Sequence, residues 1–187
     1  MFDRGEAYEK ILVADLQRVI DFLKFAETKN AALLALSSAW TLATIGLECA
    51  GRDLPRCFVY AVPVTLILVL LAALLAALSF FPKLRLPAFL GGKKAGPHSP
   101  NLIFFGDIAC MTAKEFEAGV RARYYPDKDE QRDEYLHDLA VQISVNSSIT
   151  LRKMRLFKWG VGFAIAAGCV LLLSSLMFAY GTLKGAA

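Results

Sequence analysis

The stretch CFVYAVPVTLILVLLAALLAALSFF, residues 57–81, decides the fold class of this chain of 187 residues. It contains no acidic or basic side chain. A helix of about 17 to 25 such residues crosses the hydrocarbon core of a bilayer, which is roughly 30 Å thick. Pro63 lies near its start, where a transmembrane helix tolerates a bend. We therefore predict a transmembrane helix over residues 57–81.

Two further uncharged blocks lie on either side, at residues 31–47 and 159–180. Trp159 and Tyr180 frame the later block, as expected of rings at the two membrane interfaces. The earlier block is shorter and more polar, which suits a helix packed on other helices. Its hydroxyl residues recur at helical spacing and are Ser37, Ser38, Thr41 and Thr44. With 56% hydrophobic residues and a mean hydropathy of +0.46, the chain is predicted to be a membrane protein.

The distribution of Lys and Arg predicts the orientation. Residues 1–29 carry five, the loop after the first block two, residues 82–158 thirteen, and the C-terminal tail one. The positive-inside rule places the N-terminus and residues 82–158 in the cytoplasm, and the short hairpin and the C-terminus outside. About thirty charged and amphipathic residues precede the first block, which argues against a cleaved signal peptide.

Helical periodicity extends two of the membrane helices into the cytoplasm. Apolar residues recur at three and four from Tyr8 onward, which predicts one continuous helix over about 6–48. Thr112 and Glu115 form a capping box that predicts a helix over about 113–123. A long helix is predicted from about Asp127 into the third apolar block. The fold class is thus an all-α membrane protein with three transmembrane helices, two of them extended into a small helical cytoplasmic region.

In chain order, the predicted segments are a cytoplasmic amphipathic helix (1–30), transmembrane helix 1 (31–48), an external hairpin (49–56), transmembrane helix 2 (57–81), a cytoplasmic linker and helical region (82–158), transmembrane helix 3 (159–180) and an external tail (181–187). The linker at residues 82–100 contains four prolines and three glycines, a composition that does not sustain a helix.

Catalytic and metal-binding motifs are missing from the sequence. It has no P-loop, G-x-S-x-G, H-E-x-x-H or strand-linked GxGxxG, and its four cysteines and two histidines lack the spacing of metal ligands. We predict no enzyme activity, no metal and no cofactor. Cys49 and Cys57 either pair in an oxidising compartment or serve as small interfacial side chains. Basic residues 153, 155 and 158 suit lipid headgroups, so nucleic acid is not an expected partner.

Three sequence blocks together resemble one family. FAETKNAALLAL at 25–36, NLIFFGDIA at 101–109 and DLAVQISVNSSITLRKMRLFKWG at 138–160 are similar, in order and placement, to blocks of the Pycsar effector transmembrane family. The resemblance implies a bacterial antiviral effector of the inner membrane. It implies that a cyclic pyrimidine mononucleotide, cUMP or cCMP, made by a partner cyclase, is sensed in the cytoplasm and that the membrane is then impaired.

Residue types suited to such a ligand lie near the cytoplasmic ends of the predicted spans. A cyclic phosphate is bound by Arg, Lys and backbone donors, and a pyrimidine by an aromatic face with an amide or carboxylate at its edge. The candidate ligand residues are Lys29, Asn30, Asn101, Phe104, Phe105, Asp107, Arg121, Asn146 and Arg152. Each also has a structural interpretation of its own, as a membrane anchor, a packing amide, a turn former or an interfacial ring.

Two other classes of function stay open on the sequence alone. In one alternative, the chain is an accessory or scaffold protein whose cytoplasmic helices dock a partner. In the other, it is a small channel or transporter. The absence of charge within the spans makes transport the weaker case. Gly160, Ala164 and Gly168 form a small-residue stripe that allows close helix packing. That stripe packs either against another copy in a homo-oligomer or against a span of the same chain.

Overall fold

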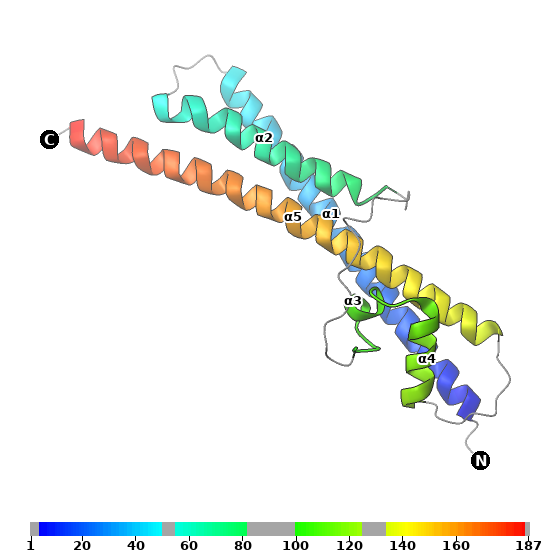
Figure 1. Cartoon of the computed structure of the whole chain (residues 1–187). Helices are drawn as coiled ribbons and strands as arrows, with labels where there is room; N and C mark the ends of the chain where they lie inside the picture. Colours follow the sequence, from blue (N-terminus) through cyan, green and yellow to red (C-terminus); the bar gives the residue numbers. More distant parts are fainter. Residues whose placement is uncertain (1–3, 50–54, 82–99, 125–133, 186–187) are drawn as a thin grey trace. The chain divides into compact units, whose positions relative to one another are not determined.

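The computed structural model describes residues 4–49, 55–81, 100–124 and 134–185. Within these residues all regular secondary structure is α-helical, which confirms the all-α class. The helices are α1 (Arg4–Cys49), α2 (Arg56–Leu78), α3 (Phe105–Ile108), α4 (Ala113–Tyr124) and α5 (Glu134–Gly185) (Figure 1). The predicted helices over 6–48 and 113–123 correspond to α1 and α4. The predicted start of the last helix near residue 127 lies outside the described residues.

The chain divides into two compact units. Unit 1 comprises Met1–Glu27 and Pro82–Met154, and unit 2 comprises Thr28–Phe81 and Arg155–Ala187. Both boundaries fall inside long helices, between Glu27 and Thr28 of α1 and between Met154 and Arg155 of α5. Consequently α1 and α5 each contribute residues to both units.

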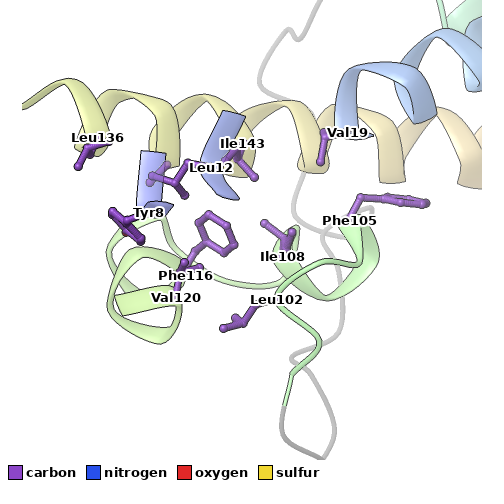
Figure 2. Packing of buried hydrophobic residues seen from close by; sticks show 11 residues of the cluster. Tyr8, Leu12, Val19, Leu102, Phe105, Ile108, Phe116, Val120, Leu136 and Ile143 are labelled. Atoms are coloured by element: carbon purple, nitrogen blue, oxygen red, sulfur yellow. The ribbon is translucent and has the colours of Figure 1, made fainter. Parts of the chain in front are cut away.

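Unit 1 has its own hydrophobic core, built by α1, α3, α4 and α5 (Figure 2). The buried members of the cluster are Tyr8, Leu12, Val19, Leu102, Phe105, Ile108, Phe116, Val120, Leu136, Ala140 and Ile143. The α1 members recur at helical spacing, so one face of α1 enters the core. The Phe116 ring lies in the middle of the cluster and is fully buried (Figure 2). The short α3 and α4 therefore complete a core that two helices alone would leave open.

The capping box at the start of α4 is confirmed. The Thr112 backbone N–H donates to Glu115 Oε2 at 2.7 Å, and the Glu115 backbone N–H donates to Thr112 Oγ1 at 3.2 Å. These reciprocal bonds satisfy two of the amide groups that a helix N-terminus leaves without intrahelical partners. The box thus fixes where α4 begins.

Unit 2 consists of α2 and the adjoining parts of α1 and α5. Leu33 of α1 and Ala72 of α2 meet Gly160 of α5, where an added Cβ would lie 2.7 Å from Leu33 Cδ2 and 3.4 Å from the Ala72 carbonyl oxygen. A Cβ at Gly168 would lie 3.6 Å from the Trp40 ring. Two residues of the predicted small-residue stripe therefore face α1 or α2 of the same chain, and the third, Ala164, is half-buried.

Two described helices are long and apolar enough to cross a membrane, Arg56–Leu78 and Tyr135–Lys184. Only 33% of the most apolar part of the first and 17% of that of the second are buried. The core helix of a soluble protein would bury most of that surface, whereas a helix in lipid exposes it. The second half of α1, where the sequence predicts the remaining span, is not one of these two helices. The fold is therefore all-helical with two candidate membrane-spanning helices, and the third span stays a prediction.

Candidate functional site

The two units divide the predicted ligand residues between them. Lys29 and Asn30 belong to unit 2. The other candidates belong to unit 1 and are Asn101, Phe104, Phe105, Asp107, Arg121, Asn146 and Arg152. Unit 1 also contains most of the charged side chains of the described residues, so the candidate site lies there.

The segment before α3 is held by its own polar side chains. The Asn101 backbone N–H donates to Asp107 Oδ2 at 2.9 Å, and the Ile103 backbone N–H donates to Asn101 Oδ1 at 3.0 Å. The structure thus brings Asn101 and Asp107 together, as closing groups of a tight turn. A ligand that contacts this segment meets a loop whose shape is already fixed.

The two adjacent phenylalanines have different surroundings. Phe105 is 8% exposed, and its ring lies 5.0 Å from that of Phe22 in the unit 1 core. Phe104 is 46% exposed, with its ring 4.9 Å from that of Phe105. A Cβ at Gly106 would collide with the Phe104 ring, so glycine permits the ring to lie there. Phe104 is the member of the pair that offers an aromatic face to a planar ligand.

Arg121 lies in a charged network on α4. Its Nε donates to Glu117 Oε1 at 3.3 Å, and its guanidinium lies 5.5 Å from the centre of the Tyr8 ring. Glu117 Oε2 is 2.7 Å from His137 Nδ1 on α5. Burial raises the pKa of Tyr8, although the positive charge of Arg121 opposes that rise. Because Glu117 already balances Arg121, a phosphate would have to compete with this carboxylate for the guanidinium.

The cationic residues of α5 lie at the end of unit 1. Lys153 Nζ donates to Glu27 Oε1 at 2.7 Å, joining α5 to α1, and the Lys153 side chain is 12% exposed. Arg152 and Asn146 are half-buried on the same helix, and the Asn146 carbonyl oxygen accepts a bond from Thr150 Oγ1 at 2.8 Å. The sequence predicts Lys153 only as a membrane anchor, because spacing along the chain does not reveal its pairing with Glu27.

Asp15 is a buried carboxylate that is not among the ligand residues predicted from the sequence. Its Oδ1 accepts a bond from Arg18 at 2.6 Å, and its Oδ2 is buried without a hydrogen-bond partner among the described residues. Burial raises the pKa of Asp15 against the opposing effect of Arg18. The helical period gave a usable signal, because Asp15 shares the core-facing side of α1 with Leu12 and Val19. A carboxyl group in this position can exchange a hydrogen bond with a polar ligand group that reaches the core.

In unit 2, Lys29 and Asn30 lie on different sides of α1. The Lys29 ammonium lies 5.3 Å from the centre of the Phe157 ring, within the range of a cation–π interaction. Asn30 is fully buried in unit 2. The structure therefore buries Asn30 and places Lys29 beside an aromatic ring of α5.

These features define a class of protein, in which a helical unit rich in charged and aromatic side chains shares two unbroken helices with an apolar unit suited to a bilayer. The family model described as the Pycsar effector protein domain matches residues 11–181. The chain is 35% identical over 167 residues to Pycsar effector protein RsPycTM of Rhizobium sp. (strain PP-F2F-G36), an alignment that covers 88% of this chain and 93% of that protein.

The chain therefore belongs to the Pycsar effector family, which confirms the resemblance of its three sequence blocks. No solved structure gave a significant match.

Proposed function

We propose that this protein is a non-enzymatic antiviral defence effector that senses cUMP or cCMP in the cytoplasm and impairs the inner membrane to abort phage infection. The observation that carries the proposal is the extent of the family match, because residues 11–181 cover most of both units, the first candidate membrane-spanning helix and nearly all of the second. A partner cyclase that makes the nucleotide follows from the same family membership.

The proposed topology has three spans, with the N-terminus in the cytoplasm and the C-terminus outside. It is supported by the excess of Lys and Arg in residues 1–29 and 82–158. In the proposed arrangement unit 1 is cytoplasmic and unit 2 lies in the bilayer. An alkaline phosphatase fused after Ala187 should then be active. If the phosphatase fusion is inactive and a separate fusion of a fluorescent protein at the same position is fluorescent, the C-terminus is cytoplasmic, which would contradict three spans.

The proposed ligand site uses the groups of unit 1 that suit a cyclic mononucleotide. The exposed ring of Phe104 stacks on the pyrimidine, since base stacking on an aromatic side chain contributes about 1–3 kcal/mol. Arg152 meets the cyclic phosphate, and Asn146 meets the edge of the base. Asn101 and Asp107 hold the loop that presents Phe104, as their hydrogen bonds support.

The proposed signal passes along α1 and α5, because each belongs to both units. A ligand that binds two arrangements of unit 1 with different affinity shifts the population of both helices. Three helices are too few to enclose a water-filled path, so we propose a homo-oligomer as the active form. Copies would contact one another through the exposed apolar surface of α2 and α5, since Gly160 and Gly168 are occupied within the chain.

Calorimetric titration of the full-length protein with cUMP, cCMP, cAMP and cyclic dinucleotides tests the proposal. We expect binding of one of the two cyclic pyrimidine mononucleotides. Arg152→Ala should weaken it roughly 10- to 100-fold, because a hydrogen bond to a charged group contributes about 1.5–3 kcal/mol. Lys94→Ala, a matched cation in the linker, should leave affinity unchanged. A folded protein that binds none of these nucleotides would favour the accessory role in which the helices dock a protein partner.

A further inference from the structure

Three hydroxyl groups in the interior of unit 2 have no hydrogen-bond partner among the described residues. They are Ser37 Oγ and Thr41 Oγ1 on α1 and Thr65 Oγ1 on α2. Ser37 is 1% exposed and Thr65 is fully buried. We call these three residues the hydroxyl seam. Their neighbours of the same chemistry behave differently, because Thr44 Oγ1 donates to the Trp40 carbonyl at 2.9 Å and Ser174 Oγ donates to the Val170 carbonyl at 2.9 Å.

Helical Ser and Thr side chains commonly donate to the carbonyl one turn earlier, which satisfies them within their own helix. The seam residues do not make that bond. A buried hydroxyl without a partner carries the full cost of its lost hydration. In a bilayer no solvent is present to relieve that cost. An apolar residue at each of these positions would therefore favour the closed packing seen here.

The three hydroxyls lie at similar levels of the unit. Leu33 and Ala72 meet at Gly160, and α2 runs back alongside the second part of α1 (Figure 1). Thr41 lies eight residues after Leu33 in α1, and Thr65 lies seven residues before Ala72 in α2. Since both helices rise about 1.5 Å per residue, Thr41 and Thr65 lie at nearly the same height along the unit. Ser37 lies one turn away on the same side of α1.

We propose that the hydroxyl seam is the site at which water enters the apolar unit and that it lines the path for water and small monovalent ions. This inference rests on the proposed membrane-impairing function and assigns residues to it. In the closed arrangement the three hydroxyls are dry and unsatisfied. When α1 and α2 separate and copies assemble, water satisfies them, so their burial cost favours opening. The seam thus supplies both a polar lining and part of the driving force for opening.

Ion flux through liposomes containing the full-length protein tests the lining role. The vesicles carry a pH-sensitive dye, a proton gradient is imposed, and cUMP and cCMP are added in separate experiments. Thr65→Val and Ser37→Ala should each lower the nucleotide-triggered flux roughly two- to tenfold, the range that corresponds to loss of one hydrogen bond. Thr44→Val is the matched control, because its hydroxyl is already bonded within α1. The control should leave the flux unchanged.

The outcomes separate the two hypotheses. Flux that is equal in the wild type, in Thr65→Val and in Ser37→Ala overturns the seam and leaves the proposed function standing. A wild-type protein that binds a nucleotide by calorimetry and yet shows no flux overturns both the membrane-impairing function and the seam.

Thermal unfolding without nucleotide gives a readout that flux does not. Thr65→Val keeps the side-chain shape and removes an unsatisfied hydroxyl, so we expect a melting temperature about 2–4 °C higher than that of the wild type. Thr44→Val, which loses a made hydrogen bond, should not show this rise. A Thr65→Val protein with a lower melting temperature than wild type would mean that the hydroxyl is satisfied in the closed protein, and the seam would be wrong.

Discussion

The close approach of α5 to α1 and α2 at Gly160 gives a prediction with a built-in control two residues away. A Cβ at Gly160 would lie 2.7 Å from Leu33 Cδ2 and 3.4 Å from the Ala72 carbonyl oxygen. A Cβ at Gly162 would meet nothing within 4 Å. Both glycines are inside α5, so Gly160→Ala and Gly162→Ala change helix propensity equally and differ in the space that receives the new methyl group.

The expected magnitudes follow from two opposing effects. Alanine in place of glycine inside a helix stabilises by about 0.5–1 kcal/mol. Forcing a methyl group into a packed interface costs about 1–3 kcal/mol. Gly162→Ala should therefore stabilise the protein by about 0.5–1 kcal/mol. Gly160→Ala should destabilise it by up to about 2 kcal/mol, because the Leu33 side chain can move but the Ala72 backbone cannot.

Thermal unfolding in nanodiscs, followed by circular dichroism, measures the difference. For a chain of this size about 1 kcal/mol corresponds to about 2–4 °C in melting temperature. The double variant Gly160→Ala with Leu33→Ala completes a mutant cycle, and we expect a favourable coupling of at least about 0.5 kcal/mol as the clash with Leu33 is relieved. Equal stabilisation by Gly160→Ala and Gly162→Ala, or a coupling of zero, would refute the close packing of α5 on Leu33.

Three further predictions concern unit 1. Glu117→Gln should destabilise the protein by about 1–3 kcal/mol in thermal unfolding, because the carboxylate loses its ion pair with Arg121 and its contact with His137. Asp21→Asn, at an exposed carboxylate, should have little effect, and equal losses would contradict the network. Burial raises the pKa of Asp15 above its ordinary value of 3.8, so the folded state holds this proton more tightly than the unfolded chain does. The protonated Asp15 therefore favours folding at low pH, and this favourable effect is lost as the pH rises through the folded-state pKa. Asp15→Asn should therefore stabilise more at pH 7 than at pH 4, and a gain that does not depend on pH would count against the shift. Thr112→Ala should weaken the start of α4 by about 0.5–2 kcal/mol, seen as faster amide exchange in its first turn, and unchanged exchange would show that the cap contributes nothing.

Much of the fold followed from local patterns in the sequence. The helical period of the apolar residues and the Thr112–Glu115 box predicted α1 and α4 to within a few residues. Residues 57–81 were predicted to form a helix, and α2 covers most of them. The division of α1 and α5 between two units depends on which side chains meet in space, and periodicity within one helix does not contain that information.

The candidate site was less predictable, because residue type does not reveal a partner. Phe104 and Phe105 are adjacent residues of the same type, yet Phe104 is half exposed and Phe105 lies in the core. Arg121 stays a predicted phosphate ligand, and its spacing of four from Glu117 is also a sequence signal for the ion pair that the structure shows. The contacts of His137 and Lys153 join distant parts of the chain, so only the three-dimensional structure reveals them.

The position of the unit boundaries within α1 and α5 has a consequence for anyone who wishes to recombine such proteins. A flexible linker between modules tolerates insertions, whereas each residue added to an uninterrupted α-helix turns everything beyond it by roughly 100°. A chimera joined after Glu27 and after Met154 must therefore preserve helical phase at both junctions simultaneously. Spacers of seven residues nearly restore the phase, with a drift of about 20°. Exchange of unit 1 among family members is thus constrained by angular register as well as by sequence.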